Sequence, residues 1–145
     1  MKERLAGWLV CPVTKQALAL RITEQAGDEI AAGELVSAAG RRYAISAGVP
    51  RMLPEELIDS GQKETRAAFS SKWERAPDFG HEEKSRTFYI NWYLERYEWN
   101  SLEKLRTFLA GKRRILDAGT GNGRDTRLYA ENSRAEVFGV DISTS

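Results

Sequence analysis

The sequence predicts three parts in order: a small α+β domain over residues 1–54, a helical linker over 55–111 and an incomplete α/β domain over 112–145. In the first part, short alternating segments broken by glycine and proline predict strands. In the second part, apolar and aromatic residues recur at helical spacing. In the third part, two apolar runs that each end in an aspartate flank a glycine-rich segment, which is the order of a strand, a turn, a helix and a strand.

The first part should begin with a short helix and continue with strands. Residues 3–9 have a helical spacing that turns Leu5, Trp8 and Leu9 inward. Three later segments alternate apolar and polar residues as short strands do: 17–23, 34–37 and 42–45. A turn or loop at residues 25–28 should separate the first of these strands from the second.

Three helices are expected in the linker. The first spans residues 62–73, the second spans 82–99, and Ser101 caps a third that ends at Gly111. The second helix carries six aromatic residues: Phe88, Tyr89, Trp92, Tyr93, Tyr97 and Trp99. These aromatic residues indicate either a packing seam between the first and third parts or a lid over a ligand.

The third part carries three glycines at alternate positions within the segment ILDAGTGNGRDT, residues 115–126. This G-x-G-x-G spacing differs from the dinucleotide-binding pattern G-x-G-x-x-G, because Arg124 stands where the third glycine belongs, so NAD binding is not expected. Asp117 ends the first apolar run, and Asp141 ends the second. The glycines let a ligand lie against bare main chain between the two acids. The alternative is a glycine-rich turn with two solvated acids.

The line LDAGTGNGRDT resembles the first motif of class I S-adenosylmethionine-dependent methyltransferases, and VDIS resembles their second motif. The resemblance covers about the last thirty residues and implies a Rossmann-like fold that binds S-adenosylmethionine. It implies a cofactor site of seven residues: Asp117, Gly119, Thr120, Gly121, Gly123, Asp141 and Ile142. Asp117 would accept from the amino group of the methionyl part, and Asp141 from both ribose hydroxyls. Asn122 should shape the loop, whereas Arg124 and Thr126 should open the helix and face solvent.

Two residues ahead of this motif are candidates for a lid. Phe69 and Trp73 lie four residues apart in a phrase that resembles the family's F-x-x-x-W, which implies that they cover the cofactor. His81, the only histidine, lies in a polar loop, where it is either a general base or a solvated loop residue. The catalytic residues stay unassigned, because this family draws them mostly from later strands and loops.

The phrases LVCPVTKQALAL and ELVSAAGRRYAISAGVPRML resemble the small zinc-ribbon-like domain typified by the activator subunit of tRNA methyltransferases. Zinc-binding members carry a C-P-x-C pair and a C-x-x-C pair. In this chain only Cys11 remains, and Thr14, Val36 and Ala39 take the other three positions. Ala47 also stands where the family commonly has an aspartate. One soft ligand cannot close a tetrahedral site, so we expect a metal-free domain in which Cys11 is a small buried residue.

Composition excludes several classes of partner. The net charge is +1, from 22 basic and 21 acidic residues. A charge this small argues against strong electrostatic attraction to nucleic acid or to a membrane surface. Glu95 and Glu98 among the aromatic residues also argue against nucleic acid. A single cysteine excludes an internal disulfide and fits a cytoplasmic location. Residues 113–145 have room for two strands and one helix rather than about five or six strands, so we expect a fragment of a longer protein.

Two functions follow as expectations. The first is the cofactor-binding part of a methyltransferase that acts on a small-molecule acceptor and is inactive as this fragment alone. The second is a docking or activator module, without catalysis, for a methyltransferase or another partner. A protein partner or self-association is expected through the exposed edge of the incomplete sheet.

Overall fold

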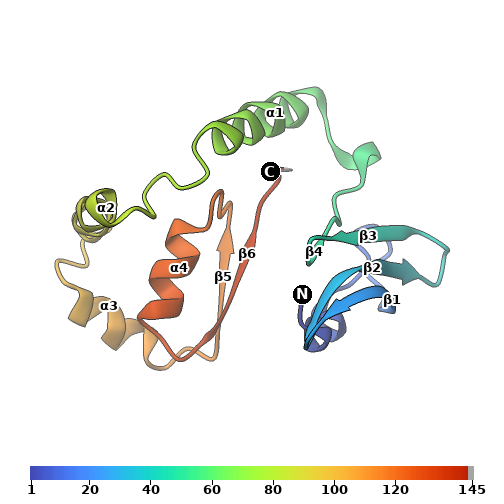
Figure 1. Cartoon of the computed structure of the whole chain (residues 1–145), viewed down its shortest axis with the longest axis horizontal. Coiled ribbons are helices and arrows are strands. Elements are labelled where there is room, and N and C mark those ends of the chain that lie inside the picture. Colours follow the sequence, from blue (N-terminus) through green and yellow to red (C-terminus); the bar gives the residue numbers. More distant parts are fainter. Residues whose placement is uncertain (144–145) are drawn as a thin grey trace. The chain divides into compact units, whose positions relative to one another are not determined.

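The computed structural model describes residues 1–143, and the contacts within it group the chain into two units, Met1–Asp59 and Ser60–Ser145. The first unit holds strands β1 to β4, and the second holds helices α1 to α4 with strands β5 and β6 (Figure 1). The segment predicted as a separate linker is thus divided, since residues 55–59 group with the first unit and the helices from α1 onward group with the second.

One antiparallel sheet with the strand order β1-β2-β3-β4 forms the first unit. Its strands are β1 (Leu18–Ala26), β2 (Glu29–Ser37), β3 (Arg42–Ser46) and β4 (Val49–Pro50). The three predicted strands are present, but β1 and β2 extend farther, to a two-residue turn at Gly27. The register shifts after Ile22 and again after Glu24, so a bulge breaks the alternation that the sequence pattern relied on.

The core of the first unit lies between the sheet and the N-terminal segment. Its buried residues are Met1, Ala6, Cys11, Ile30, Leu35, Tyr43 and Ile45. The short helix η1 (Glu3–Trp8) is a 3-10 helix that places Leu5 against this core. Leu9, which follows it, packs there as well. The prediction that Trp8 also turns inward is wrong, because 38% of its surface is exposed.

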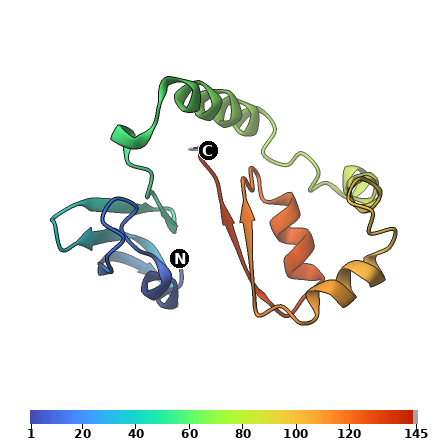
Figure 2. The ribbon, with the colours of Figure 1, turned by 180° about the vertical axis from the view of Figure 1, so that it is seen from behind.

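The second unit begins with three helices and ends with a strand, a helix and a strand. The elements are α1 (Ser60–Arg75), α2 (Glu83–Arg96), α3 (Leu102–Leu109), β5 (Arg114–Ala118), α4 (Arg124–Glu131) and β6 (Glu136–Val140). Strands β5 and β6 are parallel and in register from Arg114 opposite Glu136 to Ala118 opposite Val140. Helix α4 connects the two strands and packs against both, as Figure 2 shows from the reverse side. Two strands and one crossover helix do not define a Rossmann-like methyltransferase domain, so that assignment stays a prediction.

Helices α2 and α3 share a core with α4 in the second unit. Its buried residues are Tyr89, Tyr93, Leu94, Leu105, Leu109 and Leu128. The predicted cap of α3 is confirmed, because the Ser101 hydroxyl accepts from the Lys104 N–H at 3.2 Å. The aromatic residues of α2 and its C-cap are divided between the core and solvent: Tyr89 and Tyr93 are buried, whereas Phe88, Trp92 and the C-cap Tyr97 are exposed. Within residues 1–143, no helix has the length and apolarity that a membrane span requires.

Candidate functional site

Residues 119–123, the glycine turn, join β5 to α4. Its three glycines have φ angles of 86°, 56° and 84°, all in the left-handed region that only glycine adopts without strain. The N–H groups of Gly119 and Thr120 both donate to the carbonyl of Val140, at 2.8 and 3.1 Å. The turn is therefore fastened to the end of β6 and exposes its main chain at the carboxyl edge of the strand pair.

Asp141 lies beside the middle of this turn. One carboxylate oxygen accepts from the Gly121 N–H and the other from the Ser143 N–H, each at 2.7 Å. Burial alone would raise the pKa of Asp141, but the hydrogen bonds from Ser143, Gly121 and Ile142 hold this pKa below its ordinary value. An ionised carboxylate has about four acceptor positions, and the hydrogen bonds from Gly121, Ile142 and Ser143 occupy at least three of them. Half-buried Ile142 follows Asp141 and lies beyond the end of β6.

Asp117 is held in place by two threonines. The Thr126 hydroxyl donates to Asp117 at 2.6 Å and is itself within hydrogen-bonding distance of the Thr120 hydroxyl. Because Thr126 gives its only proton to the carboxylate, it must accept from Thr120. The prediction that Thr126 faces solvent is wrong, since this residue orients the acid at the end of β5.

Asn122 fastens the glycine turn to the loop that follows α1. Its side-chain amide donates to the carbonyls of Pro77 and Phe79 at 3.1 and 2.8 Å, so it shapes the loop as predicted. The Asn122 carbonyl accepts from His81 Nε2 at 2.9 Å. His81 is thus a part-buried residue that donates to the turn. The structure gives this residue a structural contact and no catalytic partner within the described chain.

Arg124 also joins the turn to neighbouring aromatic residues. Its guanidinium lies 5.2 Å from the ring centre of Phe79 and 4.2 Å from that of Tyr89. Burial lowers the pKa of Arg124 from its ordinary value, although the group stays charged. The prediction that Arg124 faces solvent is therefore wrong, because its cation packs between two rings.

Trp73, one of the two lid candidates, packs directly on the glycine turn. A methyl group added to Gly121 would lie 2.4 Å from Cζ2 of the Trp73 ring and 3.1 Å from its Nε1. Trp73 is 8% exposed, and its Nε1 has no hydrogen-bond partner within residues 1–143. The Lys72 ammonium lies 4.3 Å from the ring centre. Phe69, the other candidate, is 44% exposed.

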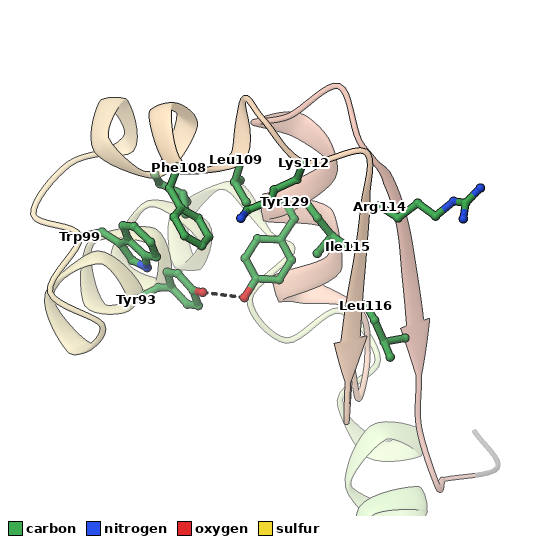
Figure 3. Close-up of a pocket in the computed structure, with 10 residues that line it drawn as sticks. Tyr93, Trp99, Phe108, Leu109, Lys112, Arg114, Ile115, Leu116 and Tyr129 are labelled. Atoms are coloured by element: carbon green, nitrogen blue, oxygen red, sulfur yellow. Dashed lines mark hydrogen bonds between the residues drawn. The ribbon is translucent and has the colours of Figure 1, made fainter.

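A cavity of about 290 Å³ lies near the start of β5 and the end of α4. The glycine turn joins the opposite ends of these two elements. It is lined by Tyr93, Trp99, Leu105, Phe108, Leu109, Lys112, Arg114, Ile115, Leu116 and Tyr129. Figure 3 shows the Tyr93 and Tyr129 hydroxyls meeting, at 2.6 Å, whereas Arg114 points away. Burial raises the pKa of both tyrosines, so both are neutral phenols. These ten residues include no carboxylate, histidine or cysteine, and the acids of the candidate site lie at the glycine turn instead.

Cys11 is fully buried in the first unit. Its sulfur lies 3.1 Å from the Tyr43 hydroxyl and accepts from the Thr14 N–H at 3.4 Å. Burial opposes the thiolate, but the hydrogen bonds from Thr14 and Tyr43 lower the pKa of Cys11 from 9.0 to about 6. Burial and the Cys11 contact raise the pKa of Tyr43 to about 12. Within residues 1–143, no three His, Cys, Asp or Glu side chains are placed to hold a metal ion, and the metal-free expectation stays a prediction.

Large apolar side chains are exposed on the first unit. They are Trp8, Val10, Val13, Ile22, Val49, Leu53 and Leu57. All but Ile22 lie in two segments, residues 8–13 and 49–57, which we name the apolar segments. They offer contact surface and no reactive group.

Comparison with known proteins gives a similarity to a chain of a solved complex. No protein-family model and no curated protein matches the chain. A chain of a solved complex between the Haloferax volcanii Trm112 methyltransferase activator and a protein described as a methyltransferase is 39% identical. The match covers 40% of this chain and 100% of that chain, with a TM-score of 0.37.

The TM-score of 0.37 is too low for a shared fold to follow from the superposition.

Proposed function

We propose that the first unit is a docking module, without catalysis of its own, for a methyltransferase. The observation that carries the proposal is the pair of apolar segments on a unit of 59 residues that already has a filled core. Exposed aromatic and aliphatic side chains of this kind are the usual anchors of a protein interface. The identity to a chain of the activator complex favours a methyltransferase as the partner.

The chemistry of the first unit also favours docking over catalysis. Its single thiol is fully buried and engaged by Tyr43 and Thr14, so a substrate cannot reach it. Nucleophilic catalysis needs an accessible thiolate next to a base.

Affinity capture with reconstitution tests the docking proposal. The tagged chain should capture a protein that transfers a methyl group from S-adenosylmethionine, and adding the purified chain should change that protein's rate or yield. Trp8→Ser should weaken the capture about thirtyfold, the effect of losing an anchor residue worth about 2 kcal/mol. Ile22→Ser is the matched control, because Ile22 is exposed but lies outside the apolar segments. Equal capture by both variants, or capture of no methyltransferase, would contradict the proposal.

We propose as a second candidate that the glycine turn binds S-adenosylmethionine. The specific observation in favour is the ionised Asp141 carboxylate, which accepts from the Gly121 N–H and so lies against the turn, where a ribose hydroxyl can donate to it. Methyl transfer to a small-molecule acceptor by a protein that contains this unit belongs to the same proposal. When bound, the cofactor would supply an electrophilic methyl group, and the residues of the turn would position it.

Ligand titration followed by NMR tests the second candidate and detects weak binding. Asp141→Ala should weaken the binding of S-adenosylhomocysteine about tenfold, since one hydrogen bond to a charged group contributes roughly 1.5 kcal/mol. NAD should not bind, because Arg124 replaces the third glycine of the dinucleotide pattern. A loss below about threefold would remove Asp141 from the site, since a hydrogen bond to a charged group contributes more. Binding of NAD alone would overturn the assignment.

A further inference from the structure

We propose that Trp73 is a ligand-binding residue whose indole N–H donates to a carboxylate oxygen of an adenosyl amino acid seated on the glycine turn. The inference rests on the second candidate function, because it assigns a further contact to the same turn. It names the chemical group that the contact recognises, an α-carboxylate.

The first argument is the unpaired donor. Trp73 is 8% exposed, and its Nε1 has no hydrogen-bond partner within residues 1–143. Buried tryptophan N–H groups usually have an acceptor, because an unpaired buried donor loses its hydration without compensation. A ligand that places an acceptor beside Nε1 would give this N–H a hydrogen-bond partner.

The second argument is the position of the donor. Nε1 lies 3.1 Å from the place that a methyl group on Gly121 would take, so the N–H edge of the ring borders the bare main chain at the centre of the turn. A ligand that lies along this main chain must pass that edge. The Trp73 ring fills the space beside Gly121, and the main chain that stays open, at Gly119 and Gly123, lies on either side of it in the turn.

The third argument is the distribution of charge. The Lys72 ammonium lies 4.3 Å from the centre of the Trp73 ring, which places a positive charge beside the donor. Asp117 and Asp141 place two acids at the ends of the adjacent strands. Two acids disfavour a pyrophosphate, whereas a zwitterion can place its carboxylate near Lys72 and its ammonium near an acid. This pattern selects an α-amino acid group.

Tryptophan indole N–H resonances report the contact directly. The chain has four tryptophans, and Trp73→Phe identifies the Trp73 signal. S-adenosylhomocysteine should shift this signal downfield, whereas 5′-methylthioadenosine, which lacks the amino acid group, should not. Trp73→Phe should weaken the binding of S-adenosylhomocysteine about tenfold, as expected for the loss of one hydrogen bond to a charged group. The same substitution should leave the affinity for 5′-methylthioadenosine unchanged. Trp92→Phe, at an exposed position on α2, is the matched control.

Each outcome decides one proposal. A shift of the Gly121 and Gly123 amides without a shift of the Trp73 indole overturns the inference and leaves ligand binding at the turn intact. An equal indole shift with both ligands also overturns it, because the donor would then sense the nucleoside. If no resonance of the turn moves at millimolar ligand, the second candidate function itself fails. If Trp73→Phe does not fold, Trp→Phe substitutions at the other three tryptophans identify the Trp73 signal by elimination, and the two titrations of the wild-type chain then decide.

Discussion

Replacing Gly121 by alanine tests the packing of the glycine turn more sharply than any other single change. Gly121 has a φ of 56°, and an added methyl group would lie 2.4 Å from the Trp73 ring. Gly123 is the matched control, because it has a φ of 84° and nothing within 4 Å of an added methyl group. Both substitutions strain the backbone, but only Gly121→Ala also meets an aromatic ring.

The two costs can be estimated separately. A left-handed φ costs an alanine about 1–2 kcal/mol, which is the full effect expected for Gly123→Ala. Forcing a methyl group into a packed contact adds about 1–3 kcal/mol, because the Trp73 ring must move from its buried position. Gly121→Ala should therefore lower the free energy of unfolding by about 2–5 kcal/mol.

Denaturant unfolding followed by tryptophan fluorescence measures both variants, since three of the four tryptophans lie in the second unit. In a Trp73→Ala background the ring is absent, so the excess cost of Gly121→Ala over Gly123→Ala should disappear. If both glycine variants lose the same stability in the wild-type background, the ring does not pack on the turn and the argument for Trp73 is refuted.

Three further outcomes are expected. Asn122→Ala should destabilise the second unit by about 1–3 kcal/mol through two lost hydrogen bonds, and amide hydrogen exchange at His81 should accelerate. The folded pKa of Cys11, about 6, lies below its ordinary 9.0, so its contribution to stability is complete above pH 9 and is lost as the pH falls through 6. Urea titrations across this range should show stability rising with pH in the wild type and a flatter profile in Cys11→Ala. Elemental analysis of the purified chain should find no stoichiometric zinc, and one zinc per chain would overturn the alignment of Val36 and Ala39 with the missing cysteines.

Local chemistry explains which elements the sequence could predict. The Ser101 cap and the strand that carries Asp117 depend on neighbouring residues, so their signals are contained in short windows of sequence. The bulge after Ile22 and the exposure of Trp8 depend on strand pairing and on packing, which no local pattern encodes.

Long-range contacts explain what the sequence could not predict at the site. Asn122 reaches carbonyls 43 and 45 residues earlier in the chain, and Arg124 packs on rings from two other elements. Nothing in the spacing of the motif indicates those partners. Thr126 is different, since its position in the first turn of α4 brings it back over the end of β5, and that geometry offered a signal.

The fastening of the glycine turn to the preceding loop changes how a mutational scan of this protein should be interpreted. Substitutions at Asn122 will reduce the amount of folded protein whether or not any ligand exists, because the side chain bonds Pro77 and Phe79. In a growth-based selection, a loss of growth on substitution in the turn therefore does not distinguish a loss of folding from a loss of ligand binding. Only a parallel measurement of protein abundance separates positions retained for folding from positions retained for binding, and Asp141 and Trp73 are where the two profiles should diverge.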